Sequence, residues 1–204
     1  MFISDSDRPR WRRLVQRLRT DLEVARRKDP ASATARLALL HPGVHAVVLH
    51  RAAHRLHRRG LVVTARLLAY LCRVLTGVDI HPGAVVGEGV FIDHGCGVVI
   101  GETAVLESEV MLYHNVTIGS VGWWNPKVVG DRRHPVICRG SVLCTGSLIL
   151  GPVTVGADCV IGANAIVLAD VPPNTRIAPG QLWQAERPSR LVAIPGPNAS
   201  GRTE

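Results

Sequence analysis

Four ionisable side chains stand out in residues 79–171, a stretch rich in valine, isoleucine and glycine: Asp79, Asp93, His94 and His134. In such surroundings an ionisable group is either solvated at a bend of the chain or used for chemistry. A histidine that is oriented by a carboxylate and keeps one ring nitrogen free can act as a general base. The alternative interpretation is that Asp93 and His94 form a polar corner without a chemical role.

The element that must position these side chains is a six-residue repeat. A period of six fits neither an amphipathic helix nor a hairpin sheet. It is typical of a β-solenoid, in which each repeat gives one short strand and one bend. His94 follows Asp79 by fifteen residues, close to one turn of three repeats, so the two could lie on neighbouring turns. The repeat is marked by small apolar residues in two series, Ile80, Val86, Ile92, Val98, Ala104, Val110 and Val116, then Ile137, Leu143, Ile149, Val155, Ile161 and Val167.

The two series are out of step, which predicts that a loop leaves the coil between them. Val116 and Ile137 are 21 residues apart, three more than a whole number of repeats. The intervening segment 119–135 holds two tryptophans, Trp123 and Trp124, and cannot continue the stack. Long loops on rigid scaffolds often carry ligand chemistry. A solvated insertion without a role is the alternative, because surface loops are cheap to lengthen.

Residues 1–78 are predicted to form an α-helical cap that covers the open first turn of the solenoid. Asp29 before Pro30 has the pattern of an N-cap residue followed by a proline in the first turn. We expect the solenoid to occupy residues 79–175, and a closing segment and tail to occupy residues 176–204. Apolar spacing and the positions of proline and glycine predict four helices, over residues 11–28, 30–40, 42–59 and 61–76.

The region of the third predicted helix is crowded with histidines. Pairs that are four residues apart share a helix face and could hold a metal ion, but no glutamate is placed as in an H-E-x-x-H motif. We therefore interpret them as surface or hydrogen-bonded histidines. The five are His41, His45, His50, His54 and His57.

The positive charge of the chain is concentrated in the predicted cap. Residues 1–78 carry sixteen Lys and Arg against five Asp and Glu, a balance of +11, whereas residues 79–204 carry eight against eleven, or −3. No helix-turn-helix, zinc-finger or aromatic platform accompanies this charge, so solvated helix faces explain it better than a nucleic-acid surface.

The cysteines and the apolar segments predict a cytoplasmic protein. The five cysteines are scattered and lack a C-x-x-C spacing, which is typical of packing residues in a reducing compartment. The longest apolar stretch, residues 61–75, is broken by Arg66 and Arg73 and is too short to span a bilayer. We therefore expect no membrane partner and no export signal.

Several motifs resemble serine O-acetyltransferases of the hexapeptide-repeat acyltransferase superfamily. They are V-D-I-H-P-G-A at 78–84, F-I-D-H-G at 91–95, G-V-V-I-G-E-T at 97–103, V-T-I-G at 116–119, R-H-P at 133–135 and V-P-P at 171–173. The resemblance extends over about residues 25 to 195. Six-residue repeats by themselves indicate an acyltransferase-type solenoid, whereas D-H-G, G-E-T and R-H-P are far more specific.

The resemblance implies a mainly β fold, a left-handed parallel β-helix of hexapeptide repeats with an N-terminal α-helical cap. It also implies a homotrimer with active sites between subunits, which in some relatives pairs into a dimer of trimers. The implied reaction transfers acetyl from acetyl-CoA to the hydroxyl of L-serine, giving O-acetylserine for cysteine biosynthesis. No metal is expected.

The resemblance assigns catalytic and ammonium-binding roles by position. His94 corresponds to the general base and Asp79 to the carboxylate that orients it. Asp93 and Asp29 correspond to the residues that receive the ammonium group of serine. A histidine suits the first role because its ordinary pKa of about 6.5 lets it take a proton from a hydroxyl at neutral pH.

The resemblance also assigns binding roles on the other side of the substrates. Arg133 and His134 correspond to the residues that grip the serine carboxylate, for which a planar guanidinium fork is well suited. Gly119 and Thr145 fall where the backbone of the family faces coenzyme A.

The sequence departs from the family pattern on the donor and acceptor side. Ser120 stands where a second glycine is usual, the segment 121–129 replaces a shorter glycine-rich one, and Arg132 is an extra arginine. The usual acyl group and acceptor are therefore open to question. The tail that docks into the sulfhydrylase partner normally ends in isoleucine, but this chain ends in Glu204, which argues against docking to O-acetylserine sulfhydrylase.

Three other functions stay open at the level of sequence. A related O-acyltransferase with a different hydroxyl acceptor or acyl donor would fit the tryptophan-containing loop. A metal-dependent lyase or hydratase could use His94, His114 and His134 as ligands. A non-catalytic partner-binding module would use the basic cap.

Overall fold

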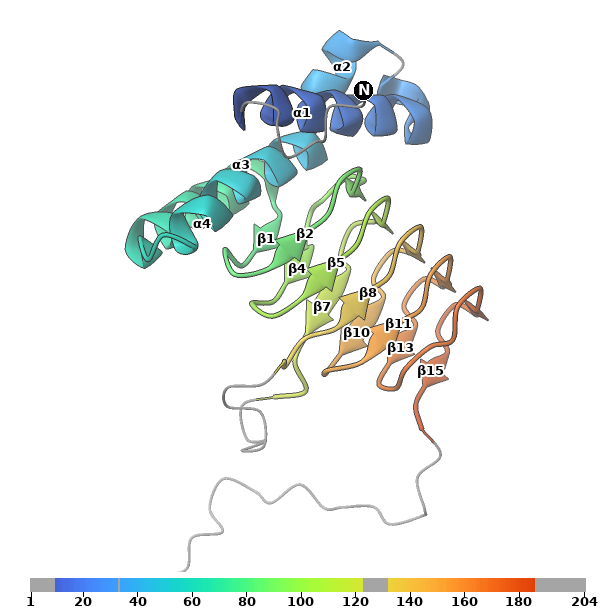
Figure 1. The fold of residues 1–204 in the computed structure, drawn as a ribbon. Coiled ribbons are helices and arrows are strands. Elements are labelled where there is room, and N and C mark those ends of the chain that lie inside the picture. Colours follow the sequence, from blue (N-terminus) through green and yellow to red (C-terminus); the bar gives the residue numbers. More distant parts are fainter. Residues whose placement is uncertain (1–9, 33, 123–131, 186–204) are drawn as a thin grey trace, which may run out of the picture.

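The computed structural model describes residues 10–32, 34–122 and 132–185. α-Helices sit at one end of a coil of short parallel strands, and the coil extends away from them (Figure 1). Within the described residues, no helix combines the length and the apolar character needed to cross a membrane.

The helices follow the predicted segments with one division. They are α1 (Arg10–Lys28), the 3-10 helix η2 (Pro30–Ser32), α2 (Ala35–Leu39), α3 (Pro42–His57) and α4 (Val62–Thr76). The helix predicted over residues 30–40 is split, because Thr34 adopts an extended conformation and its hydroxyl accepts the Leu37 N–H as the N-cap of α2. Asp29 has the capping role expected of it, since its Oδ1 accepts the Ala31 N–H at 2.8 Å.

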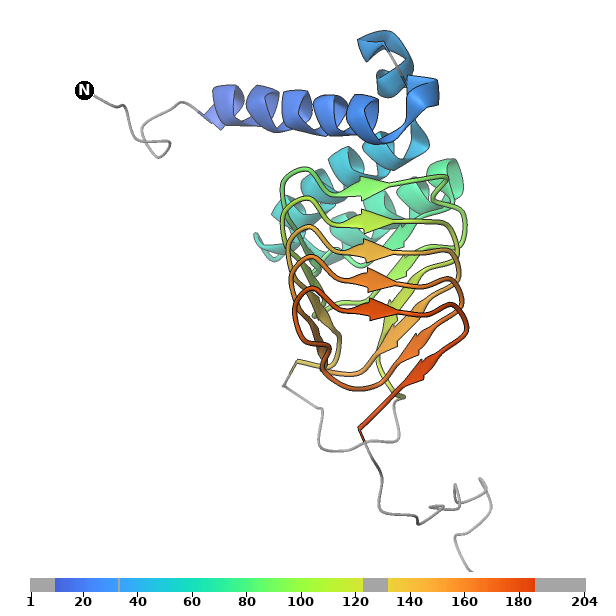
Figure 2. The same cartoon turned by 90° about the vertical axis from the view of Figure 1, so that its right-hand side faces the viewer.

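The strands form three parallel sheets, which are the three faces of a triangular prism of about five turns (Figure 2). The first face holds β1 (Asp79–Ile80), β4 (Val99–Ile100), β7 (Thr117–Gly119), β10 (Leu148–Leu150), β13 (Ile166–Val167) and β15 (Leu182–Trp183). The second face holds β2 (Val85–Val86), β5 (Val105–Leu106), β8 (Val136–Ile137) and β11 (Thr154–Val155). The third face holds β3 (Phe91–Ile92), β6 (Met111–Leu112), β9 (Val142–Leu143), β12 (Val160–Ile161) and β14 (Arg176–Ile177).

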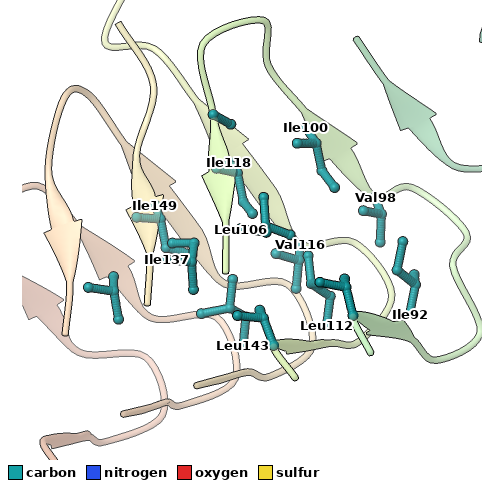
Figure 3. Close-up of a cluster of buried hydrophobic side chains, with 14 of the residues drawn as sticks. Ile92, Val98, Ile100, Leu106, Leu112, Val116, Ile118, Ile137, Leu143 and Ile149 are labelled. Atoms are coloured by element: carbon teal, nitrogen blue, oxygen red, sulfur yellow. The ribbon is translucent and has the colours of Figure 1, made fainter. Parts of the chain in front are cut away.

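The predicted solenoid and its apolar interior are confirmed. Every member of the two six-residue series is buried except Val86, which is half-buried. Isoleucine, leucine and valine side chains from successive turns stack along the axis of the prism (Figure 3). Burial of this continuous column is the main contribution that holds the coil together.

One step in the register differs from the sequence interpretation. Ile80 pairs with Ile100, twenty residues later, whereas Ile100 pairs with Ile118, eighteen residues later. The corner between β3 and β4 therefore holds six residues, 93–98, where four residues join β2 to β3. The members of the first series from Val98 to Val116 therefore occupy a second inward position, two residues before the one that Ile80 holds. The second series returns to the first position, because Ile137 pairs with Leu106, the partner of Val86. The slip stays hidden in the sequence because both positions are buried.

The predicted extrusion of a loop is confirmed by the strand register. Ile118 pairs with Ile149, 31 residues later, instead of the eighteen that separate Ile100 from Ile118. Thirteen extra residues therefore leave the coil between β7 and β8. Trp123 and Trp124 lie outside the described residues.

The coil continues past the point where the sequence predicts its end. β14 pairs with β12, and β15 pairs with β13, so both strands add to the prism beyond residue 175. The two prolines at 172–173 are accommodated at a corner, where the backbone needs no ladder hydrogen bond from them.

Ion pairs dock the basic cap onto the acidic solenoid. Arg17 of α1 pairs with Glu88 at 2.9 Å, and Arg27 pairs with Glu109 at 3.2 Å. Lys28 donates to the backbone oxygen of Glu109 at 3.0 Å. These contacts are exposed and each contributes little by itself. Together they explain part of the charge difference between the two halves without a nucleic-acid partner.

His50 makes the stability of the cap dependent on pH. It lies in α3 with 3% of its surface exposed. Burial, reinforced by the neighbouring His54, lowers the pKa of His50 from 6.5 to about 4. Between these values the unfolded chain binds a proton at this position and the folded chain does not, so stability falls as the pH falls from about 6.5 towards 4.

Replacement of His50 by glutamine should remove this dependence, since the glutamine amide does not titrate and can still donate a hydrogen bond. Between about pH 7.5 and pH 5 the variant should lose about 2 kcal/mol less unfolding free energy than the unmodified protein. Urea denaturation at the two pH values measures the difference. Equal losses in the two proteins would mean that His50 is protonated in the folded state.

Candidate active site

The residues with expected chemical roles divide between two edges of the prism. Asp93, His94 and Thr145 lie where the chain crosses from the third face to the first, and Asp79 begins the first face next to them. Gly119, Arg133 and His134 lie where the chain crosses from the first face to the second. In one chain, therefore, the structure gathers the expected residues into two groups and does not join them.

His94 presents its ring to solvent at the third-to-first edge. Its side chain is 76% exposed, and its Nε2 lies 3.9 Å from Asp93 Oδ1. Its φ of 60° places it in the left-handed region, which an ordinary side chain rarely adopts. The other described non-glycine residues in this region are Asn115, Asn164, Asn174, Asp158 and Glu109, and three of these five are asparagine, which tolerates the conformation well. A histidine held in this sparsely populated conformation is consistent with a role for its imidazole, since such residues cluster at active sites.

Asp79 lies beside this edge but is engaged by the cap. Its Oδ2 pairs with Arg73 Nη1, from the last turn of α4, at 3.3 Å. Its backbone N–H donates to Val98 O at 2.9 Å, so the start of β1 runs next to the six-residue corner that contains His94. Among the described residues no hydrogen bond joins Asp79 to His94, and the orienting role of Asp79 stays a prediction.

The two carboxylates expected to bind an ammonium group are brought together by the cap. Asp29, between α1 and η2, and Asp93, directly after β3, both face the imidazole of His41. His41 Nε2 lies 3.9 Å from Asp29 Oδ2 and 3.7 Å from Asp93 Oδ1. The arrangement concentrates negative charge next to the exposed ring of His94, which suits a small cationic ligand.

Arg133 and His134 are held by a network centred on Thr103. The Thr103 hydroxyl oxygen accepts the N–H groups of Arg133 at 2.9 Å and of His134 at 3.1 Å. The guanidinium of Arg133 forms an ion pair with Glu102. The neighbouring Arg132 donates to Pro152 O at 2.6 Å, so it fastens the re-entering chain to the next turn.

The same network sets the tautomer of His134. Its Nδ1 lies 2.9 Å from Thr103 Oγ1 and accepts the Thr103 N–H at 3.2 Å. Because the Thr103 oxygen already accepts two N–H groups, its own hydrogen points to Nδ1, and the ring hydrogen of neutral His134 resides on Nε2. Burial, with the adjacent Arg133 charge, lowers the pKa of His134, although Glu102 opposes the shift. The ring packs against Gly101, where a Cβ would lie 2.1 Å from Nε2.

The two positions expected to face coenzyme A also fall on separate edges. Gly119 ends β7, and its carbonyl accepts the Gly151 N–H at 2.9 Å. Thr145 is half-buried in the corner after β9, and its carbonyl accepts the Asn164 N–H at 2.8 Å. The expected donor site is thus divided in the same way as the expected acceptor site.

The histidines of the metal-dependent alternative do not meet within one chain. The rings of His94 and His114 are perpendicular, with centroids 6.2 Å apart. His134 belongs to the other edge and is held by Thr103. Among the described residues no group of three or more potential ligands could hold a metal ion.

Three contributors to the site were not singled out from the sequence. His41 was grouped with the helix histidines, although a His-Pro pair directly before a helix indicates an N-cap position. Glu102 and Thr103 lie in the quoted G-E-T motif, but no local signal connects them to Arg133 and His134, about 30 residues away. The contacts depend on the size of the extruded loop.

No protein-family model matches the chain. The chain is 46% identical over 179 residues to a serine acetyltransferase of Mycobacterium tuberculosis, covering 86% of this chain and 76% of that protein. Its fold matches Neisseria gonorrhoeae serine acetyltransferase in complex with serine, with a TM-score of 0.75, 36% identity and coverage of 81% of this chain and 66% of that chain. It also matches serine acetyltransferase of Brucella abortus in complex with coenzyme A, with a TM-score of 0.77, 34% identity and coverage of 91% and 70%. As in these neighbours, the prism is a left-handed β-helix.

Replacement of Thr103 by valine should loosen the segment that carries Arg133 and His134. Valine has nearly the same shape as threonine but leaves two backbone N–H groups without their acceptor, which should cost about 1–2 kcal/mol of unfolding free energy. Thr103→Ser keeps the hydroxyl and is the matched control. Denaturant unfolding of the two variants measures the difference. Equal stability of the valine and serine variants would contradict the network.

Proposed function

Because this chain belongs to the serine acetyltransferase family, we propose that it transfers the acetyl group of acetyl-CoA to the hydroxyl of L-serine. The products are O-acetylserine, for cysteine biosynthesis, and free coenzyme A. The family consists of CoA-dependent acetyltransferases. Serine and coenzyme A are the ligands of the two solved relatives described above.

The observation that carries the proposal is the short distance between Asp93 and His94. Asp93 Oδ1 lies 3.9 Å from His94 Nε2 and faces Asp29 across His41. An amino acid whose ammonium group binds these two carboxylates places a hydroxyl on its β-carbon within reach of the exposed imidazole. The two carboxylates would not favour a sugar, which has no cationic group to offer.

His94 acts as the general base in this scheme. It takes the proton from the serine hydroxyl as the oxygen attacks the thioester carbonyl of acetyl-CoA. The tetrahedral intermediate then expels the coenzyme A thiolate, which receives the proton from the imidazolium. His94 is thereby returned to its neutral form, and no covalent enzyme intermediate is formed. Asp79 orients the base once the substrates are bound, and the imidazolium that forms is stabilised by this neighbouring acidic edge.

Arg133 and the Nε2–H of His134 bind the serine carboxylate. Both are donors, and His134 stays neutral near pH 7 because its pKa is lowered. They lie on the first-to-second edge, whereas the base and the ammonium site lie on the third-to-first edge. A complete acceptor site therefore needs the first-to-second edge of one subunit to face the third-to-first edge of another.

A cyclic trimer satisfies this requirement. Head-to-tail contacts between two different edges close into a ring when the rotation allows it. Gly119 and Thr145 are divided between the same two edges, so one interface would complete the donor and acceptor sites together. Pairing of trimers through the caps stays a prediction from the family resemblance.

We place the enzyme in the cytoplasm. All five cysteines are free thiols, and Cys96 is exposed, which suits a reducing compartment.

Replacement of His94 by asparagine should abolish transfer and leave the fold intact. Asparagine tolerates the left-handed backbone of this corner but cannot act as a base. The unmodified protein should release coenzyme A from acetyl-CoA when L-serine is added, and the variant should do so at least about a hundredfold more slowly. A thiol assay measures both rates, with homoserine as the comparison acceptor. A variant that keeps near-normal turnover would exclude His94 as the base.

Two inactive variants should restore activity when they are mixed. His94→Asn and Arg133→Ala each disable every site of their own trimer. In a mixed trimer one interface in three combines the intact His94 of one subunit with the intact Arg133 of its neighbour. Random reassembly from equal amounts should give about a quarter of the normal activity, because about three quarters of the trimers are mixed. A mixture that stays inactive would place both residues in the site of a single chain.

A further inference from the structure

We propose that His41 is a positioning residue of the acceptor site: its Nε2–H holds the carboxylates of Asp29 and Asp93 in the arrangement that receives the ammonium group of the substrate. The proposal rests on the proposed function. It assigns a role to a histidine that the general-base chemistry does not use.

The position of His41 is fixed from two sides. It is the N-cap residue of α3, and its side chain is only 9% exposed. Its ring lies against Phe91 of β3, with centroids 5.0 Å apart. The start of α3 is clamped to the same strand, because a Cβ on Gly43 would lie 2.0 Å from Ile92 O. Only glycine permits this approach. The clamp places the His41 ring beside Asp93, the residue that follows Ile92.

The cap hydrogen bond determines which ring nitrogen carries the hydrogen. Nδ1 accepts the Gly43 N–H at 3.1 Å, so the hydrogen of the neutral ring is on Nε2. That N–H faces Asp29 Oδ2 at 3.9 Å and Asp93 Oδ1 at 3.7 Å. Both distances exceed a hydrogen bond of about 2.7–3.2 Å. The donor therefore lies between two acceptors without closing on either.

This geometry reduces the cost of keeping two carboxylates side by side. Like charges at short range repel. A buried dipole whose positive end points between them offsets part of that repulsion and fixes their spacing. Asp29 comes from the cap and Asp93 from the solenoid. His41 therefore links the packing of the cap on the solenoid to the spacing of the two carboxylates that are proposed to bind the ammonium group.

The competing explanation is that His41 only caps α3. The two roles use different ring nitrogens, so they can be separated. Asparagine is among the best N-cap residues and its short side chain can accept the Gly43 N–H, but it does not reach the carboxylates. Glutamine is a poor N-cap residue, but its longer amide can reach the position of Nε2. His41→Asn therefore keeps the helix-capping role, and His41→Gln keeps the contact with the carboxylates.

The test compares steady-state kinetics of the unmodified full-length protein with the two variants. In His41→Asn, we expect the melting temperature to stay near that of the unmodified protein and the KM for L-serine to rise about tenfold or more. The KM for acetyl-CoA should change by less than about twofold. His41→Gln should have a KM for serine closer to normal in spite of a lower melting temperature.

A serine analogue without the amino group supplies the decisive control. 3-Hydroxypropanoate cannot use the two carboxylates, so its inhibition constant against serine should be the same in His41→Asn and in the unmodified protein. An unchanged KM for serine in His41→Asn would reduce His41 to a helix cap. A parallel loss of serine and 3-hydroxypropanoate affinity would indicate general distortion, and would also overturn the proposal. Failure of the unmodified protein to release thiol with serine would instead overturn the proposed function.

Discussion

The structure depends on one constraint, the burial of two small apolar side chains per six-residue repeat in the axis of a narrow prism. Column positions such as Ile100, Leu112 and Ile118 hold apolar side chains, and none of the carboxylates or arginines of the described coil is among the buried residues. The register is broken at two places that matter for chemistry: the enlarged corner at residues 93–98 and the thirteen extra residues between β7 and β8. The first carries Asp93 and His94, and the second carries Arg133 and His134. The rigid column fixes where each break occurs.

The helical cap is part of the candidate site as well as a cover for the first turn. Its docking uses exposed ion pairs along α1 and a close contact of Gly43 with the backbone of Ile92. The second contact matters more for function, because it brings Asp29 and His41 to the carboxylate of Asp93. The basic charge of the cap is thereby given a local explanation. Cations such as Arg17, Arg27 and Arg73 meet carboxylates of the solenoid.

Within a single chain, the residues proposed to bind the two substrates are divided between two edges of the prism. Arg133, His134 and Gly119 share one edge, while the proposed base His94, Asp93 and Thr145 share the other. In the single chain, Arg133 forms an ion pair with Glu102, and Asp79 forms one with Arg73. In the proposed trimer, substrate binding at the interface would give each of these charges a second partner.

The sequence by itself determined the solenoid, its buried positions, the limits of α1, α3 and α4 to within about two residues, and the place where a loop leaves the coil. These follow from local patterns: a period of six, and the proline, glycine and capping residues at helix ends. The sequence motifs also predicted the residues of the candidate site, whose roles stay proposals. The tertiary structure decided the enlarged corner before β4, the division of the segment 30–40, the extension of the coil to β15, and the partners of Asp79, Arg133 and Asp93. The physical reason is that these features depend on which turn of the coil packs against which. Each six-residue repeat has two inward positions that can both be apolar, so the sequence does not determine which residues of neighbouring turns pair.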